Sequence, residues 1–241
     1  KEFHPKVDPD MALFLLLIFP TAIFYNAIYT ESLFLFFSVT TFLFALRRRF
    51  WLAGLCGLLA SLTRVTGAFL ALPLLVEYVQ AYGWRGLWRP RLLSVALPGC
   101  GLLGFFAYHG WKFGDPTLFF QVERTWGRSL AINHDHFQVL TSAALSNLFL
   151  DVGFFIFGLV TMVYAFCKLR PSYGWYMAAT LIVVATTGSL MSANRYIAVL
   201  FPIFILGASI KSSFIRATWM TVSLLLLALY TGLFVHGYWA G

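Results

Sequence analysis

Three charged residues stand at the edges of strongly apolar runs: Glu31 after YNAIYT, Arg64 in SLTRVTG and Arg195 in SANRYIA. The guanidinium of arginine offers a fixed fork of N–H donors that suits phosphate or carboxylate. Two arginines that each precede an apolar run could share one anionic ligand such as a lipid phosphate. The alternative is that both anchor at a membrane surface. Glu31 could contact a sugar hydroxyl, pair with an arginine, or lie in a first helical turn capped by Thr30.

Polar and aromatic neighbours could complete a site around these charges. Tyr25 and Tyr29 lie one helical turn apart if the run that contains Pro20 stays helical. Gly67, close to Arg64, would permit a headgroup to approach the chain closely. The predicted substrate-binding residues are Arg64, Arg195, Glu31, Tyr29, Asn194, Tyr196 and Trp126.

The stretch WKFGDPTLFFQVERTWGRS mixes aromatic and charged residues. Its Gly114-Asp115-Pro116 triplet predicts a turn, because Asp can accept bonds from the backbone beyond it and Pro fixes the next φ. The following alternation of apolar and charged residues suits a short amphipathic helix at a membrane interface, which could roof a cavity. The apolar positions of this helix are Phe119, Phe120, Val122, Trp126 and Leu130.

Two further patterns, a His-Asp-His group and the cysteines, are weaker evidence for a functional site. His134, Asp135 and His136 could bind a divalent metal, but neighbouring ligands in a loop lack further partners at helical spacing, so a metal cofactor stays an open alternative. The cysteines show no CxxC spacing and lie in or beside apolar runs, which predicts small core residues and no disulfide framework. They are Cys56, Cys100 and Cys167.

The composition predicts an integral membrane protein. Of the 241 residues, 60% are hydrophobic and only 11% are charged, and the mean hydropathy is +0.81. A spanning helix needs about 20 mostly apolar residues. We therefore expect an all-α bundle with about nine transmembrane segments and a single transmembrane domain over residues 1–241. The expected segments are 11–29, 31–46, 50–63, 65–82, 92–110, 139–167, 173–191, 195–210 and 217–235.

The net charge of +8 follows this topology rather than indicating a nucleic-acid partner, because the basic residues cluster between apolar runs. Charges on the outer side are not needed for membrane insertion, so they are candidates for a site that faces water or a polar ligand. The predicted cytoplasmic residues are Arg47, Arg48, Arg49, Arg85, Arg89, Arg91, Lys168, Arg170, Lys211 and Arg216. The predicted outer residues are Glu31, Arg64, Lys112, Asp115, Glu123, Arg124, Arg128, Asp135 and Arg195.

Four stretches, in this order, resemble one family: FPTAIFYNAIYTESLFLF, LASLTRVTGAFLALPLLVEY, FGDPTLFFQVERTWGR and NRYIAVLFPIFI. They are similar to the PIG-V family, the mannosyltransferases that add the second mannose of glycosylphosphatidylinositol, and to its bacterial relatives. The resemblance implies a polytopic glycosyltransferase of the GT-C class. Such an enzyme takes a sugar from a dolichyl- or polyprenyl-phosphate donor and transfers it to a lipid-linked or glycolipid acceptor on the outer or lumenal face. Arg64 and Arg195 would then hold the donor phosphate.

The chain departs from that class in one respect. The resemblance implies a catalytic acid in the first outer loop, which would lie upstream of Lys1. We therefore expect a fragment that lacks the N-terminal spans and is inactive alone, with Glu31 and Asp115 as alternatives inside the chain.

Two other classes of function remain as alternatives. A transporter or flippase would show broken or charged segments near mid-membrane and internal pseudo-repeats. A non-catalytic membrane subunit would need Arg64 and Arg195 for assembly rather than turnover.

The expected location is an integral membrane position in either the bacterial plasma membrane or the endoplasmic reticulum.

Overall fold

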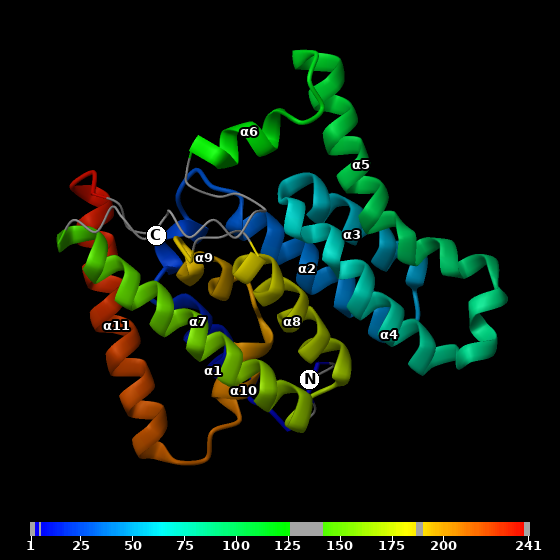
Figure 1. The fold of residues 1–241 in the computed structure, drawn as a ribbon. Helices are drawn as coiled ribbons and strands as arrows, with labels where there is room; N and C mark the ends of the chain where they lie inside the picture. Colours follow the sequence, from blue (N-terminus) through cyan, green and yellow to red (C-terminus); the bar gives the residue numbers. More distant parts are fainter. Residues whose placement is uncertain (1–2, 5, 126–141, 187–189, 239–241) are drawn as a thin grey trace.

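The computed structural model describes residues 3–4, 6–125, 142–186 and 190–238. These residues form α-helices and short 3₁₀ helices, and no strand occurs among them (Figure 1). The predicted all-α fold is therefore confirmed. The predicted metal ligands His134, Asp135 and His136, together with Trp126, lie outside the described residues.

The helices follow one another with short connections. The α-helices are α1 (Pro9–Leu17), α2 (Glu31–Leu46), α3 (Phe50–Thr63), α4 (Ala71–Tyr82), α5 (Leu93–Phe113), α6 (Leu118–Thr125), α7 (Ser142–Lys168), α8 (Pro171–Thr186), α9 (Ala193–Ala198), α10 (Pro202–Ala208) and α11 (Ser213–Val235). The 3₁₀ helices are η1 (Ala22–Tyr25), η2 (Val65–Leu70), η3 (Trp84–Trp88) and η4 (Pro90–Leu92).

Several helical stretches are apolar enough to lie in a membrane. Among the described residues, four are also long enough to cross it: Val65–Tyr82, Pro90–Phe113, Phe149–Lys168 and Ser213–Val235. The apolar helices α2 and α3 have only 16 and 14 residues. The prediction of a membrane protein is thus supported, but the predicted count of about nine spans is not confirmed.

Proline explains two places where an expected span is broken. α1 ends at Leu17, Pro20 follows, and η1 adds a single turn that ends at Tyr25. The expected segment 195–210 is split into α9 and α10 because Pro202 lies at the N-terminus of α10, where its missing N–H needs no partner. The condition for placing Tyr25 and Tyr29 on one helical face is therefore not met.

Small residues bring α3 and α5 close together. A Cβ at Gly54 would overlap the carbonyl oxygen of Ser94, so only glycine fits there. The hydroxyl of Ser61 donates a 2.7 Å hydrogen bond to the carbonyl of Pro98, inside α5. These contacts fix the C-terminal end of α3, where Arg64 begins the connection to η2.

Buried aromatic rings hold the other half of the bundle. The ring of Phe42 in α2 lies edge-on to Tyr173 and Tyr176 of α8 and to Phe201, with centroids 5.1 to 5.5 Å apart. Tyr173 and Tyr176 are almost fully buried. The core thereby sets α2 against α8 and against the segment that connects α9 to α10.

The cysteines do not all lie in the core. Cys56 is half-buried, whereas Cys100 and Cys167 are exposed on the outer surface of the bundle. The prediction of small core residues is wrong for these two, because an apolar surrounding in a membrane protein does not require burial inside the protein. All three are free thiols.

The bundle has two distinct ends. α6 lies at one end, and the connection between α10 and α11, which carries Lys211, lies at the opposite end (Figure 1). Which of these two ends faces the cytoplasm stays a prediction.

Candidate functional site

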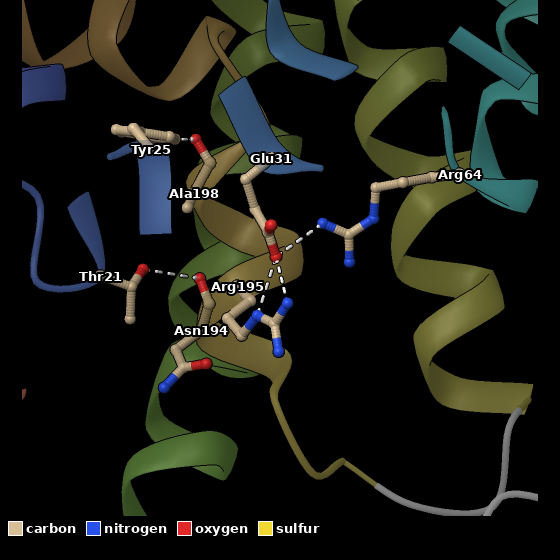
Figure 2. Close-up of polar contacts among 7 residues, drawn as sticks. All are labelled: Thr21, Tyr25, Glu31, Arg64, Asn194, Arg195 and Ala198. Carbon is tan, nitrogen blue, oxygen red and sulfur yellow. Dashed lines mark hydrogen bonds and ion pairs between the residues drawn. The ribbon is translucent and has the colours of Figure 1, made fainter. Parts of the chain in front are cut away.

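Three residues that the sequence singled out meet in space. Glu31 is the first residue of α2, Arg64 follows α3, and Arg195 lies in α9. Oε1 of Glu31 accepts hydrogen bonds from Nε and Nη2 of Arg195, at 2.8 and 2.5 Å. Nη1 of Arg64 lies 3.0 Å from the same oxygen. Figure 2 shows both guanidinium groups directed at this single carboxylate oxygen.

The cluster is buried and only partly satisfied. The side chain of Glu31 is 0% exposed, and those of Arg64 and Arg195 are 14% and 15% exposed. Oε2 of Glu31 accepts no hydrogen bond from the described residues, and Nη1 of Arg64 forms an ion pair without an aligned hydrogen bond. Two positive groups thus share one negative group in a place where unpaired charge is costly. An additional anion would neutralise the remaining positive charge.

Aromatic rings hold both guanidinium groups in place. The central carbon of Arg195 lies 4.6 Å from the ring centroid of Phe24 and 4.5 Å from that of Tyr29. The corresponding carbon of Arg64 lies 5.0 Å from the ring of Tyr196. Cation–π contacts of this kind stabilise a guanidinium that is removed from water. The predicted residues Tyr29 and Tyr196 therefore belong to the cluster.

A tight turn after α3 positions Arg64. The amide of Gly67 donates a 2.8 Å hydrogen bond to the carbonyl of Arg64, so η2 folds back onto α3. A Cβ at Gly67 would lie 2.6 Å from the carbonyl oxygen of Ala60. Gly67 is thus needed for contact with the α3 backbone. The approach of a headgroup, which the sequence suggested for this glycine, stays a prediction.

Arg195 is positioned by the first segment of the chain. The hydroxyl of Tyr25 donates a 2.7 Å hydrogen bond to the carbonyl of Ala198, and Thr21 donates at 3.3 Å to the carbonyl of Asn194 (Figure 2). Asn194 is 2% exposed and does not line the cavity described below. These bonds fix α9, and hence Arg195, against the turn of η1.

Thr30 does not act as the predicted cap. It occupies the N-cap position of α2, but its side chain forms no capping hydrogen bond. Its backbone already has helical angles, with ψ at 0°, whereas a capping residue usually has extended ψ that directs its oxygen toward the first turn. The carboxylate of Glu31 contacts Arg64 and Arg195 instead.

A cavity of about 360 Å³ lies against the two arginines. Its polar lining includes Arg64 and Arg195 together with Tyr29, Thr63, Thr66 and Glu123. Glu31 does not line this cavity and stands behind the guanidinium groups. A ligand in the cavity would therefore meet the two arginines and not the carboxylate that balances them.

A second cavity of about 690 Å³ adjoins the first and is mainly apolar. Residues of α5, α6, η2 and α8 line it, among them Phe69, Leu102, Phe106, Phe120 and Val183. Five residues line both cavities: Val65, Thr66, Phe119, Glu123 and Tyr196. A polar space and an apolar space thus meet at one boundary, which suits a ligand with a charged head and a hydrocarbon tail.

The predicted turn and amphipathic helix are both present and form the roof of these cavities. Gly114 ends α5 with φ at 74°, in the left-handed region that favours glycine. α6 then returns over α5, with the rings of Phe119 and Phe120 packed 5.7 and 5.5 Å from those of Phe105 and Phe106. The helix prediction is confirmed as far as Thr125, where the described residues stop.

Asp115 stabilises the turn that leads into this roof. Its carboxylate accepts 2.7 Å hydrogen bonds from the amide and the hydroxyl of Thr117, and a 2.6 Å bond from Gln121. The side-chain bond from Thr117, followed by its backbone bond, holds the pKa of Asp115 below its ordinary value. Asp115 is half-buried, its carboxylate is bonded within its own turn, and it lines neither cavity, so nothing in its geometry favours the predicted alternative of a catalytic acid.

Metal binding finds no support among the described residues. No group of three or more His, Cys, Asp or Glu side chains in that part of the chain is arranged to hold a metal ion. His134, Asp135 and His136 lie outside it, so the metal prediction is untested.

A second buried carboxylate was missed from the sequence. Glu77 in α4 accepts hydrogen bonds on both oxygens from Arg170, at 2.8 and 2.7 Å, and a 2.5 Å bond from the hydroxyl of Ser172. The hydrogen bonds to the Glu77 carboxylate raise the pKa of Arg170. In the sequence analysis, Arg170 was assigned only to the cytoplasmic side, whereas in the structure it also joins α4 to the start of α8. The available signal was a lone acid inside the apolar run LALPLLVEY.

Comparison with protein-family models, with curated proteins and with solved structures gave no match. The resemblance to the PIG-V family therefore stays a prediction.

Proposed function

We propose that this protein is a membrane glycosyltransferase that takes a sugar, mannose by the family resemblance, from a dolichyl- or polyprenyl-phosphate donor. The acceptor is a lipid-linked or glycolipid hydroxyl at the outer or lumenal face. The observation that carries the proposal is the pair of partly exposed arginines, Arg64 and Arg195, that share a buried carboxylate at the wall of a polar cavity that adjoins an apolar one.

The charge of the cluster suits the phosphate of such a donor. Arg64 and Arg195 contribute two positive charges and Glu31 one negative charge, which leaves one positive charge for a ligand. A sugar linked through phosphate to a lipid is a phosphodiester with one negative charge. When the bond between the sugar carbon and the phosphate oxygen breaks, a second charge develops on the phosphate. Guanidinium groups fixed in a buried site stabilise that developing charge.

The apolar cavity supports a hydrocarbon chain on the same ligand. It lies under α6 with α5 on one side and α8 on the other, and the helix of α5 belongs to the candidate span Pro90–Phe113. A lipid tail in this space would keep its phosphate at the boundary where Thr66 and Tyr196 line both cavities. The same arrangement would place the sugar in the polar cavity.

The proposal also states which helices cross the membrane and which side of the membrane the cluster faces. In a GT-C-like bundle, the short helices α2, α3 and α8 also cross the bilayer, and the cluster faces the side where lipid-linked sugars are found. The host membrane is the bacterial plasma membrane or the endoplasmic reticulum. Glu31, one of the two catalytic alternatives inside the chain, is engaged by two arginines.

The test is transfer of radiolabelled mannose from polyprenyl-phosphate mannose in membranes that contain the complete gene product. Arg64→Ala and Arg195→Ala should each lower transfer by about 100-fold or more, since each removes a donor to the developing charge. Arg216→Ala is the matched control, because this arginine lies in α11, away from both cavities.

Two outcomes would contradict the proposal. If the wild-type protein is folded but transfers no lipid-linked sugar, a transporter, a flippase or a non-catalytic subunit becomes the better assignment. If Arg64→Ala and Arg195→Ala lower protein abundance but leave the turnover of the remaining protein unchanged, the two arginines serve assembly.

A further inference from the structure

The connection between α4 and α5, residues 83–92, carries two outward-facing tryptophans. Trp84 is 75% exposed and Trp88 is 92% exposed, and neither lines the cavities beside Arg64 and Arg195. One candidate span ends at Tyr82, where this connection begins, and the next candidate span starts within the connection, at Pro90. The connection therefore lies at the depth where a membrane meets water, and tryptophan is enriched at that depth.

Three arginines alternate with these tryptophans in the stretch WRGLWRPR. Arg85, Arg89 and Arg91 are all exposed. The central carbon of the Arg89 guanidinium lies 5.4 Å from the ring centroid of Tyr82, and Nη1 of Arg91 donates a 3.4 Å hydrogen bond to the Tyr82 hydroxyl. Tyr82 thus holds two of the three guanidinium groups in place.

The backbone of this connection is fixed against α4. The hydroxyl of Tyr78, whose side chain is fully buried, donates a 3.0 Å hydrogen bond to the carbonyl of Gly86. A Cβ at Gly86 would lie 2.6 Å from the Cβ of Tyr82, so glycine is needed for this close approach. The exposed tryptophans and arginines are therefore carried by a backbone with fixed contacts.

No carboxylate in the described part of the chain balances the positive charge of this connection. Arg85, Arg89 and Arg91 form no ion pair with the carboxylates described. The sequence from residue 78 to residue 114 contains no Asp or Glu. Glu77, just before that stretch, is bound on both oxygens by Arg170.

A second basic turn lies beside the connection. The ring centroid of Phe50, at the start of α3, lies 4.9 Å from that of Tyr78 and 5.4 Å from that of Tyr82. Arg48 and Arg49 directly precede Phe50, are exposed, and form no ion pair with a described carboxylate. The end of α4 thus gathers exposed positive charge from two turns of the chain.

We propose that the connection between α4 and α5 binds the headgroup of an anionic phospholipid. The guanidinium groups of Arg85, Arg89 and Arg91 donate hydrogen bonds to the lipid phosphate, while Trp84 and Trp88 lie among the headgroups. An anionic lipid fits better than a zwitterionic one, because it supplies the net negative charge that the described part of the chain lacks here. This site is separate from the Glu31 cluster and does not depend on the function proposed above.

The test compares dioleoyl phosphatidylglycerol with dioleoyl phosphatidylcholine as ligands of the complete gene product in detergent. Affinities come from the rise in Tm with lipid concentration, since a ligand that binds the folded state stabilises it. Wild type should bind the anionic lipid about 10-fold or more tightly than the zwitterionic lipid. The triple variant Arg85→Gln, Arg89→Gln and Arg91→Gln should bind the two lipids within about threefold of each other, because the headgroup charge has lost its partners.

A matched control removes three positive charges elsewhere, by Lys168→Gln, Lys211→Gln and Arg216→Gln, and should keep the preference of wild type. Loss of the preference in this control, or its retention in the triple variant of the connection, would overturn the proposal. The Glu31 cluster is a second place where a phosphate can bind, so Arg64→Ala is measured in the same way. If the preference disappears in Arg64→Ala alone, the lipid binds at that cluster, which also overturns the proposal.

A second measurement reports on the connection itself. Comparison of wild type with Trp84→Phe and Trp88→Phe gives the share of the tryptophan emission that comes from these two residues in bilayers. Phosphatidylglycerol with brominated acyl chains should quench this share more than brominated phosphatidylcholine does, and the triple arginine variant should remove the difference. Emission from Trp84 and Trp88 that neither lipid quenches would show that the connection faces water and would overturn the proposal.

Discussion

Glu31 and Glu77 are both buried carboxylates paired with arginine, yet they are used in different ways. Both oxygens of Glu77 are bound by the fork of Arg170, and Ser172 adds a third bond. Glu31 presents one oxygen to two arginines, while its other oxygen accepts no bond from the described residues. The first pair is complete within the protein, whereas the second leaves an excess positive charge beside a cavity.

The difference indicates which cluster is structural and which is suited to a ligand. A bidentate arginine–carboxylate pair is a strong, geometrically specific contact, and it joins two helices at Glu77. The Glu31 cluster keeps two guanidinium groups buried and oriented but does not neutralise them both. A site that binds an anion must hold its donors in place without satisfying them fully, and Glu31 supplies that arrangement.

The largest effect on stability is expected from Arg170→Ala. The substitution leaves Glu77, whose side chain is only 4% exposed, without its charged partner. Loss of one member of a buried pair costs about 3 kcal/mol or more. Thermal unfolding in detergent should show a clear fall in Tm. The effect of Glu77→Gln should be smaller, because Arg170 is 43% exposed and can reach water; an equal or larger effect would contradict the comparison.

Glu31→Gln should respond to anions in a way that Glu77→Gln does not. We expect a loss of about 2 kcal/mol, below the full cost of breaking a buried pair, because the two arginines can reach the cavity. Added inorganic phosphate should restore part of the Tm of Glu31→Gln, since a ligand that binds the folded state stabilises it. The same phosphate series on Glu77→Gln is the control and should show no recovery beyond that of wild type.

Gly67→Ala tests how the Glu31 cluster is built. The added Cβ would press on the backbone of Ala60, so the turn that carries Arg64 must move. We expect destabilisation of about 1 to 3 kcal/mol, together with weaker binding of lipid phosphate. Gly99→Ala in α5 is a matched control, because a Cβ there has open space around it. Unchanged binding in Gly67→Ala would show that the turn does not position Arg64.

The smallest effect is expected at Asp115, a half-buried carboxylate that is bonded by Thr117 and Gln121 and not by an arginine. Because its pKa is held below the ordinary value of 3.8, its turn is stabilised above that pH and loses this contribution as the pH falls through the lowered pKa. NMR titration of the carboxyl group should show a midpoint below 3.8. Thr117→Val removes the hydroxyl donor and should raise the midpoint toward that value; an unchanged midpoint would contradict the assigned cause.

The sequence singled out the three charged residues of the cluster but not the way they pack together. Glu31, Arg64 and Arg195 stood out because charges at the edges of apolar runs are rare and costly. Nothing local could show that two arginines share one oxygen of Glu31, since α3 and α9 meet α2 only through the tertiary fold. The Gly114-Asp115-Pro116 turn was predicted correctly because its geometry depends on adjacent residues alone.

Two of the expected spans are not continuous helices, because proline interrupts the apolar run. Pro20 and Pro202 break segments that hydropathy alone treats as continuous. Glu77 was missed for a related reason: a single acid in an apolar run changes its mean hydropathy little. Its partner Arg170 comes 93 residues later and resembles any basic residue of a cytoplasmic turn.

The most direct test of the central claim is the affinity of the complete gene product for farnesyl phosphate in detergent, with farnesol as the uncharged control. Arg64→Ala and Arg195→Ala should each weaken binding by about 10-fold or more, because each removes a charged hydrogen-bond donor from the phosphate. Arg216→Ala, at the start of α11 and away from both cavities, should bind as wild type does. Equal affinity for farnesyl phosphate and farnesol, or an equal loss in Arg216→Ala, would contradict the assignment of the Glu31 cluster as a phosphate site.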